Sequence, residues 1–258
     1  MKIGLCGMTL LWADARLRAD HRVRAATDFR WLTGSGGHLA AASQRSHVFG
    51  ASSSRRFFLG SESKTGVVEG GVLPYQPWAA AKVRQLTEHM EFDPTGHCHY
   101  EGIPHAMYFS FQIVETPQFI AVLHENMHAW RLIYMDGSHH ATDYSAWMGD
   151  SRGHWEGNTL VVDVADNNDK SVFDMAGHFH SDALHVVERF TPIDRDTINY
   201  QATIDDSKVF TRPWKMGFPL KRAPKDYMFL ESGCFEDERD QQHLVKDHSA
   251  LPAGHYQQ

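Results

Sequence analysis

The sequence predicts a mainly β protein, either an antiparallel β-barrel of the lipocalin-like kind or a β-sandwich, with one short helix before the strands and a flexible N-terminal arm. Short β-branched or alternating runs recur from Phe111 onward, and turn residues (Gly, Pro, Asp, Asn) separate them. Helix-forming residues are concentrated in one segment before these runs. A barrel is favoured over a sandwich because closure removes exposed strand edges and encloses a pocket lined by alternate residues.

Composition divides the chain into two segments. The 258 residues are 42% hydrophobic, enough to bury a full core, and we expect a single β domain with a pocket over 67–258. Residues 1–66 carry 10 Lys and Arg against 4 Asp and Glu, whereas residues 67–258 have a net charge of −13. An acidic main domain argues against nucleic acid as a partner, because phosphate binding needs the opposite field.

The first segment begins with an apolar run of eleven residues, Ile3 to Ala13, behind a single Lys2. Ala13-Asp14-Ala15 follows as a small-x-small pattern, so the run is similar to a weak export signal; a short buried strand or helix start is the alternative. The protein would be periplasmic or secreted if the signal operates, and cytoplasmic otherwise. A membrane span is excluded, because it needs roughly 20 apolar residues. The remainder, up to Gly66, has the composition of a flexible basic arm.

One helix of about three turns is expected over Ala79 to Met90, with Pro77 at the first helical position. Its buried stripe would consist of Trp78, Val83 and Leu86. A turn at 93–96 ends this segment, and a loop containing Cys98 follows.

About eight strands are expected after the helix, with a hairpin joining the fifth and sixth around 194–196. The expected strands are Phe111 to Glu115, Phe119 to Glu125, His128 to Met135, Leu160 to Val164, Leu184 to Thr191, Thr197 to Ile204, Val209 to Gly217 and Tyr227 to Ser232. The stretch from Trp147 to Glu156 is expected to be a charged loop that opens onto the strand at Leu160.

The charged loop supplies the first candidate group: Asp150, Arg152, His154 and Glu156. Arg152 can place its guanidinium on a carboxylate of the ligand or of the protein. A structural Asp-Arg pair that fixes the loop is the alternative interpretation.

Glu125, His128 and Arg131 form a second candidate group. His128 and Arg131 have opposite parity, so in a regular strand from His128 they would face opposite sides. They share a site only if the strand begins later or a bulge intervenes. The two interpretations are an acid-base or substrate-anchoring site, and a satisfied His at a strand end.

A third candidate group contains His178, His180 and His185, which fall within the His-rich part of the chain. A His-x-His pair followed by another His can supply three ligands to a divalent metal and leave one position open for water. Asp182, Glu188 or His128 would then orient the ligands. The alternative is a polar loop whose imidazoles serve as hydrogen-bond donors or acid-base groups.

Residues 73–242 resemble a family of bacterial proteins that are often predicted to be exported and have no established activity. The resemblance is carried by LPYQPWAA at 73–80, DPTGHC and GIPHAM within 93–107, FQIVETP at 111–117, HENMHAWRLIYMDG at 124–137, WMGDSRGHWEGNTLVVDV at 147–164, HVVERF at 185–190 and TRPWKMGFPL at 211–220. Two positions depart from the family pattern: the chain has Phe235 where members commonly show His, and Asn158 where they show Asp.

The three Cys exclude a disulfide-dense scaffold. Cys98 and Cys234 both lie inside the resemblance, whereas Cys6 lies in the signal-like run. An exported chain could form one Cys98–Cys234 bridge. Two free buried thiols are the alternative.

Two functions remain open. The first is an enzyme of the lyase, isomerase or hydrolase type that acts on a small, partly apolar molecule by His and carboxylate proton transfer, with or without a divalent metal. Its base or acid would be His128 or His185, oriented by Glu188, and Arg131 or Arg152 would hold developing negative charge. The second is a non-catalytic small-molecule-binding barrel. The sequence has no Walker loop, dinucleotide fingerprint or GxSxG elbow, so no nucleotide cofactor is expected.

Overall fold

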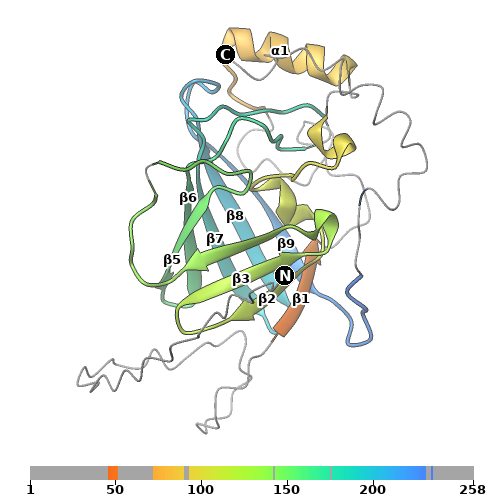
Figure 1. Cartoon of the computed structure of the whole chain (residues 1–258), viewed down its shortest axis with the longest axis vertical. Coiled ribbons are helices and arrows are strands. Elements are labelled where there is room, and N and C mark those ends of the chain that lie inside the picture. The colour runs from red at the N-terminus through yellow and green to blue at the C-terminus, as the bar shows by residue number, and fades with distance from the viewer. Residues whose placement is uncertain are drawn as a thin grey trace, which may run out of the picture.

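The computed structural model describes residues 46–51, 72–89, 93–141, 143–174, 176–230 and 234. Its strands form one sheet that curls round and closes on itself (Figure 1). This confirms the predicted mainly β, barrel-like fold. The signal-like run and most of the expected arm lie outside the described residues.

The strands follow one another around the barrel in chain order, and the first closes the sheet by pairing with the last. They are β1 (Ser46–Ala51), β2 (Phe111–Glu115), β3 (Phe119–His124), β4 (Trp130–Tyr134), β5 (Asp150–Glu156), β6 (Thr159–Ala165), β7 (His185–Asp194), β8 (Thr197–Asp205) and β9 (Trp214–Arg222). Short 3-10 helices interrupt the connections: η2 (Pro94–His97), η3 (His105–Tyr108) and η4 (Asn126–His128).

Several of the predicted strands are confirmed. β2 has the predicted bounds, and β3, β6, β7 and β8 differ from the prediction by a few residues at their ends. β4 is shorter because η4 precedes it, and β9 begins and ends five residues later than expected. The strand expected at Tyr227 to Ser232 is wrong over 227–230, which have no regular structure.

Two strands were missed by the sequence prediction. β1 lies in the segment expected to be a flexible arm, yet it pairs with both β2 and β9. β5 was expected to be a loop because its alternate residues are charged. Its first two inward positions are Ser151 and Gly153, which are too small to give the usual apolar alternation, and both are buried.

One junction in the barrel departs from the antiparallel arrangement. β4 pairs with β5 in parallel, and only through Ile133 with Ser151 and Tyr134 with Arg152. All other neighbouring strands are antiparallel. The β4–β5 junction is therefore the least extensively paired part of the sheet.

The helix α1 (Pro77–Glu88) lies beyond one end of the barrel (Figure 1) and has the expected proline at its start. The predicted buried stripe is confirmed in part: Val83 and Leu86 pack against the core, whereas Trp78 is 46% exposed and Ala79 is the fully buried residue. The helix contacts a loop rather than the sheet, with Trp78 5.8 Å from the ring of Phe179. No helix in the described part of the chain is long and apolar enough to cross a membrane.

The barrel interior is occupied by alternate side chains of the strands, as the two-residue period requires. Tyr200 of β8 and Phe218 of β9 pack with ring centres 5.0 Å apart. The helix η3 is entirely buried, and its Tyr108 packs 5.0 Å from Phe218. The core is therefore aromatic and aliphatic, and η3 contributes to it from outside the sheet.

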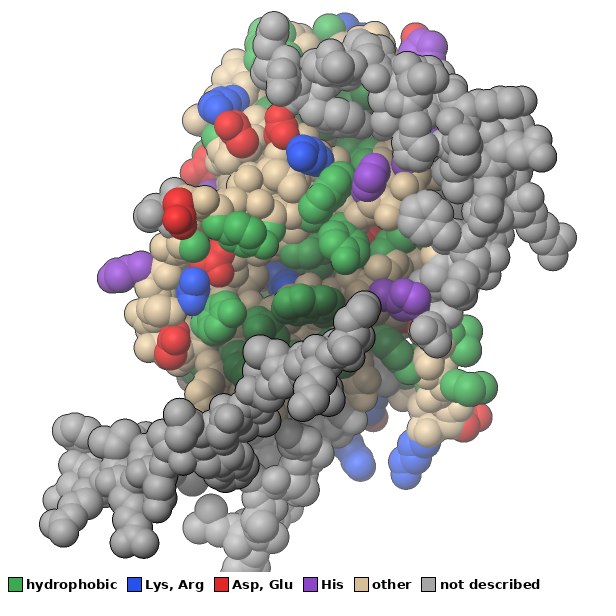
Figure 2. Space-filling view, in the orientation of Figure 1, with side chains coloured by type: hydrophobic (Ala, Val, Ile, Leu, Met, Phe, Trp, Pro, Cys, Tyr) green, Lys and Arg blue, Asp and Glu red, His purple; other side chains and the backbone are tan. Residues whose placement is uncertain are grey.

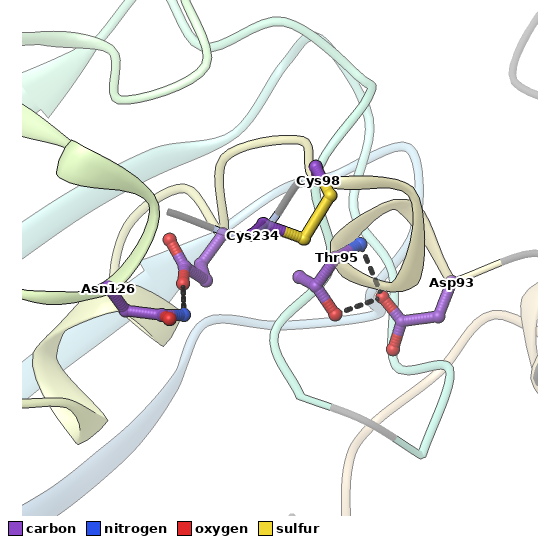
Figure 3. Close-up of a disulfide and its surroundings, with 6 residues drawn as sticks. Asp93, Thr95, Cys98, Asn126 and Cys234 are labelled. Atoms are coloured by element: carbon purple, nitrogen blue, oxygen red, sulfur yellow. Dashed lines mark hydrogen bonds between the residues drawn. A yellow bond between two sulfur atoms is a disulfide. The ribbon is translucent and has the colours of Figure 1, made fainter. Parts of the chain in front are cut away.

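A disulfide joins Cys98 to Cys234, 136 residues apart in sequence. Figure 3 shows the bridge with the η2 turn on one side and Asn126 on the other. In the η2 turn, Asp93 accepts hydrogen bonds from the backbone N–H and the hydroxyl of Thr95. Of the two alternatives that the sequence left open, the structure has the bridge. It connects the segment between β1 and β2 to the segment after the last strand.

Candidate functional site

A cluster of carboxylates and imidazoles covers the outer face of β5, β6 and β7. Asp150 and Arg152 project from β5, Asp163 from β6 and His185 from β7, because these positions alternate with the buried inward ones. The pairing of Arg152 with Asp163 across β5 and β6 brings the side chains together. His140, in the loop between β4 and β5, completes the cluster.

His140 lies between two carboxylates. Its Nδ1 is 3.2 Å from Asp150 Oδ2, and its Nε2 is 3.1 Å from Asp163 Oδ1. The same oxygen of Asp163 lies 2.7 Å from His185 Nε2. One carboxylate thus holds two imidazoles, and the side chain of His185 remains 44% exposed to solvent.

Arg152 forms the ion pair with Asp150 that the sequence left as one of two interpretations. Its Nε and Nη2 donate to Asp150 Oδ2 at 3.0 and 2.8 Å, and its Nη1 donates to Ser138 Oγ at 2.7 Å. The guanidinium lies 4.6 Å from the ring centre of Tyr134. These contacts fix one edge of the cluster.

The geometry of this cluster is compatible with a metal ion. His140, Asp150 and Asp166 each offer a ligand atom, and the three atoms lie within 4.8 Å of one another. Asp166 directly follows β6, and its Oδ2 is buried without a hydrogen-bond partner. Neutral imidazole and carboxylate oxygen are both ordinary ligands of divalent metals.

A second polar group lies inside the barrel. Arg131 of β4 donates to Glu188 of β7 at 2.7 Å, and the two side chains are 2% and 0% exposed. Tyr200 donates to the other oxygen of Glu188 at 2.8 Å. Burial, aided by the nearby Glu188 charge, raises the pKa of Tyr200 well above its ordinary value, so the hydroxyl remains a donor.

His124, at the end of β3, shares this interior. Both of its ring nitrogens are buried without a hydrogen-bond partner. Burial lowers the pKa of His124 to about 3, and the charge of Arg131 acts in the same direction. The backbone of Ala106 acts in the opposite direction and is the smallest of these three influences on the pKa of His124. His124 is therefore a neutral imidazole beside a guanidinium.

The three histidines expected to bind a metal do not form one group. His178 Nδ1 lies 2.8 Å from Asp174, and His180 Nε2 lies 2.8 Å from Ser171 Oγ. His185 contacts Asp163 on the outer face of the sheet. This arrangement corresponds to the alternative interpretation, in which the imidazoles of this segment serve as hydrogen-bonding groups.

The remaining candidates are separate from both groups. His128 is exposed in η4 before β4 begins, whereas Arg131 is buried, so the two residues do not share a site. His154 is exposed on the outer face and lies 3.4 Å from Glu156. Glu188 faces the interior and cannot orient His185, which faces outward three residues earlier.

Sequence reasoning missed five residues of these groups: His140, Asp163, Asp166, His124 and Tyr200. One signal was available, because Asp163 is the single charged residue in the apolar run Leu160 to Val164. His140 and Asp166 lie in irregular segments, where the sequence gives no period from which a side-chain direction could be inferred.

No protein-family model, no curated protein and no solved structure was found to match the chain.

Proposed function

We propose that the protein is a metal-assisted enzyme of the lyase, isomerase or hydrolase type, and that its site is the cluster on the outer face of β5, β6 and β7. The observation that carries the proposal is the position of His140 between Asp150 and Asp163. Metal-bound histidines commonly donate their second ring N–H to a carboxylate. In this arrangement His140 Nδ1, Asp150 and Asp166 would hold the ion, and Asp163 would orient His140.

Two further observations support a cation at this position. Ligand atoms bound at about 2.0–2.1 Å to a tetrahedral ion are separated by roughly 3.3 Å, which is close to the 3.2 Å between His140 Nδ1 and Asp150 Oδ2. Asp150, Asp163 and Asp166 bring three negative charges, and Arg152 brings one positive charge. A divalent cation would balance the remaining two.

His185 is the group best placed to move a proton in this cluster. Asp163 holds its Nε2, and the imidazole is accessible to solvent. A carboxylate in this position fixes the orientation of the ring. Arg152 would hold negative charge that develops on the substrate. A bound divalent metal would supply an activated water or polarise a carbonyl or phosphoryl oxygen.

The metal site is tested on protein purified without chelator, stripped of metal and titrated with Mn²⁺ or Zn²⁺ by calorimetry and elemental analysis. We expect one ion per chain, loss of binding in His140→Ala and Asp166→Asn, and an affinity about 10–100-fold lower in Asp163→Asn. His154→Ala, on the same face of the sheet, and His178→Ala are matched controls that should bind normally. Binding that survives His140→Ala but is lost in His178→Ala would place the ion in the loop instead.

Catalysis is tested with the metal-loaded protein on a panel of small carboxylic and phosphate esters. His185→Gln should lower kcat by about 10²-fold or more with little change in KM. A non-catalytic small-molecule-binding protein, the alternative expected from the sequence, would bind members of the panel without converting them, and the variant would change affinity alone.

We also infer that the protein functions outside the cytoplasm, as the resemblance to an often exported bacterial family implies. The Cys98–Cys234 bridge supports this, because disulfides persist mainly in oxidising compartments. The signal-like run at 3–15 agrees with it. Fusion of residues 1–30 to alkaline phosphatase, which is active only after export, tests the inference, and an inactive fusion would contradict it.

A further inference from the structure

The guanidinium of Arg131 has hydrogen-bond donors that the protein does not use. Its Nη1 donates to Glu188 at 2.7 Å and lies 3.5 Å from Ser151 Oγ. Its Nη2 reaches only the sulfur of Met107, at 3.9 Å, and its Nε is buried without a partner. Nε and Nη2 form one edge of the guanidinium, which is the geometry that receives an oxygen acceptor.

His124 adds a second unsatisfied group to the same interior. It is 3% exposed, neither nitrogen has a partner, and it lies close enough to Arg131 to be affected by its charge. Leaving a buried polar group unpaired is energetically costly, so such groups usually indicate a bound molecule or water. Two neighbouring groups of this kind, both facing the barrel interior, point to one shared acceptor.

Charge balance determines the kind of acceptor. Arg131 and Glu188 already neutralise each other, and His124 is neutral near pH 7. An added carboxylate would leave one uncompensated negative charge in a low-dielectric interior, which is strongly unfavourable. A carbonyl oxygen can accept from both donors and brings no net charge.

The surroundings suit an apolar body attached to that carbonyl. Tyr108, Tyr200 and Phe218 pack with ring centres about 5.0 Å apart, and Met107 and Met216 lie beside them. Methionine adapts its shape to a ligand more readily than other apolar residues. On the outer surface, Figure 2 shows hydrophobic side chains grouped over the middle of one face of the molecule, with charged side chains around them.

The sheet is sparsely paired beside Arg131, at the junction between β4 and β5. Arg131 precedes the two β4 residues that pair with β5, so the backbone beside it is not joined to β5. Segments with few backbone pairings open at lower free energy than the rest of a sheet.

We propose that the barrel interior holds a second binding site, separate from the outer cluster, for a small uncharged carbonyl compound with an apolar body. Its oxygen accepts from the Nε and Nη2 edge of Arg131 and from His124. The molecule class includes ketones, esters and amides.

The test follows methionine methyl groups by NMR while acetophenone is titrated into the full-length protein. The Met107 and Met216 methyl signals should shift with saturation, whereas Met228, which is 73% exposed, should not. Benzoate and ethylbenzene, which have the same ring with an anionic group or no oxygen, should bind at least about tenfold more weakly.

His124→Phe should weaken acetophenone binding about tenfold while leaving the Arg131–Glu188 pair in place. The double variant Arg131→Met/Glu188→Gln removes the Nε and Nη2 donors of Arg131 without leaving a lone buried charge. Its matched control is the double variant Arg189→Met/Glu156→Gln, which removes an ion pair on the outer face. Unchanged Met107 and Met216 signals would mean that water alone satisfies these donors. Equal binding of ethylbenzene, or tighter binding of benzoate, would also overturn the proposal.

Discussion

At the residue scale, the charged groups enclosed by the barrel have the largest expected effect on stability. Arg131 and Glu188 form an ion pair across the interior, between strands that are not neighbours in the sheet. A buried pair of this kind contributes little net stability compared with apolar residues of the same size. Removing one partner is costly, because the other charge remains buried without compensation.

Glu188→Gln should therefore lower the free energy of unfolding by about 3–5 kcal/mol, measured by urea denaturation. Glu156→Gln is the matched control, because Glu156 also pairs with an arginine, Arg189, but on the exposed outer face. Surface pairs contribute little, so the control should have nearly wild-type stability. Similar losses in the two variants would contradict the burial argument.

His124 gives a pH dependence with a defined sign. Its pKa is about 3 in the folded protein and near 6.5 in the unfolded chain, so between these values the unfolded state binds the additional proton. The contribution of His124 to the free energy of unfolding is fully present above pH 6.5. It is lost as the pH decreases toward 3, by up to about 1.4 kcal/mol per pH unit. Burial also lowers the pKa of His105 and His180, which adds to the same trend.

Denaturation curves of wild type and His124→Phe between pH 4.5 and 6.5 measure this contribution. The variant should lose part of the pH dependence, so the difference in stability between the two proteins should change with pH. His154→Phe, an exposed histidine, serves as the control and should show the wild-type slope. Parallel profiles for wild type and His124→Phe would show that His124 is not held neutral by burial.

At the element scale, the β4–β5 junction determines whether the barrel remains closed. The two strands are joined over a short parallel stretch, and Gly153 of β5 allows their side chains to approach. A Cβ at position 153 would lie 2.6 Å from both Ile133 Cγ2 and Met135 Sδ. The absence of a side chain at this position is therefore a packing requirement of the junction.

Gly153→Ala should destabilise the protein by about 1–3 kcal/mol through overpacking, as measured by chemical denaturation. Faster hydrogen exchange in β4 and β5 than in β7 and β8 should accompany it, since the junction is displaced locally. Gly96→Ala is the matched control, because a Cβ there meets nothing within 4 Å. Equal stability of the two variants would show that β4 and β5 can separate without cost.

At the scale of the whole molecule, the Cys98–Cys234 bridge connects the segment between β1 and β2 to the chain after β9. It encloses most of the sheet in one covalent loop, so it restricts the unfolded chain much more than a local bridge would. Asp93 and Thr95 hold the η2 turn beside the bridge by their own hydrogen bonds. The loop that contains η2 thus has a local anchor and a long-range one.

Reduction, or the double variant Cys98→Ser/Cys234→Ser, should lower the free energy of unfolding by about 2–5 kcal/mol. Thermal and urea denaturation with and without reductant measure the effect. Reductant should have no further effect on the double variant, which controls for unspecific action on the protein. Identical unfolding of the oxidised wild type and the double variant would contradict this stabilising role.

The sequence by itself determined the mainly β class, the helix and most of the strands, and it favoured a barrel over a sandwich, because the alternation of apolar residues and the positions of turn residues are local properties. It failed at β5, where small inward residues hide the alternation, and at β1, whose pairing depends on strands distant in sequence. It also identified Asp150, Arg152 and His185, as well as Arg131 and Glu188, as candidate site residues on chemical grounds.

Only the tertiary structure decided how these residues are grouped. Parity placed Arg131 and Glu188 inside the barrel and Asp150, Arg152 and His185 outside it, so one expected site became two. His140 and Asp166 joined the outer cluster from irregular segments. A closed sheet fixes which strands are neighbours and which face is inward through long-range pairing, and that information is not contained in any single stretch of the chain.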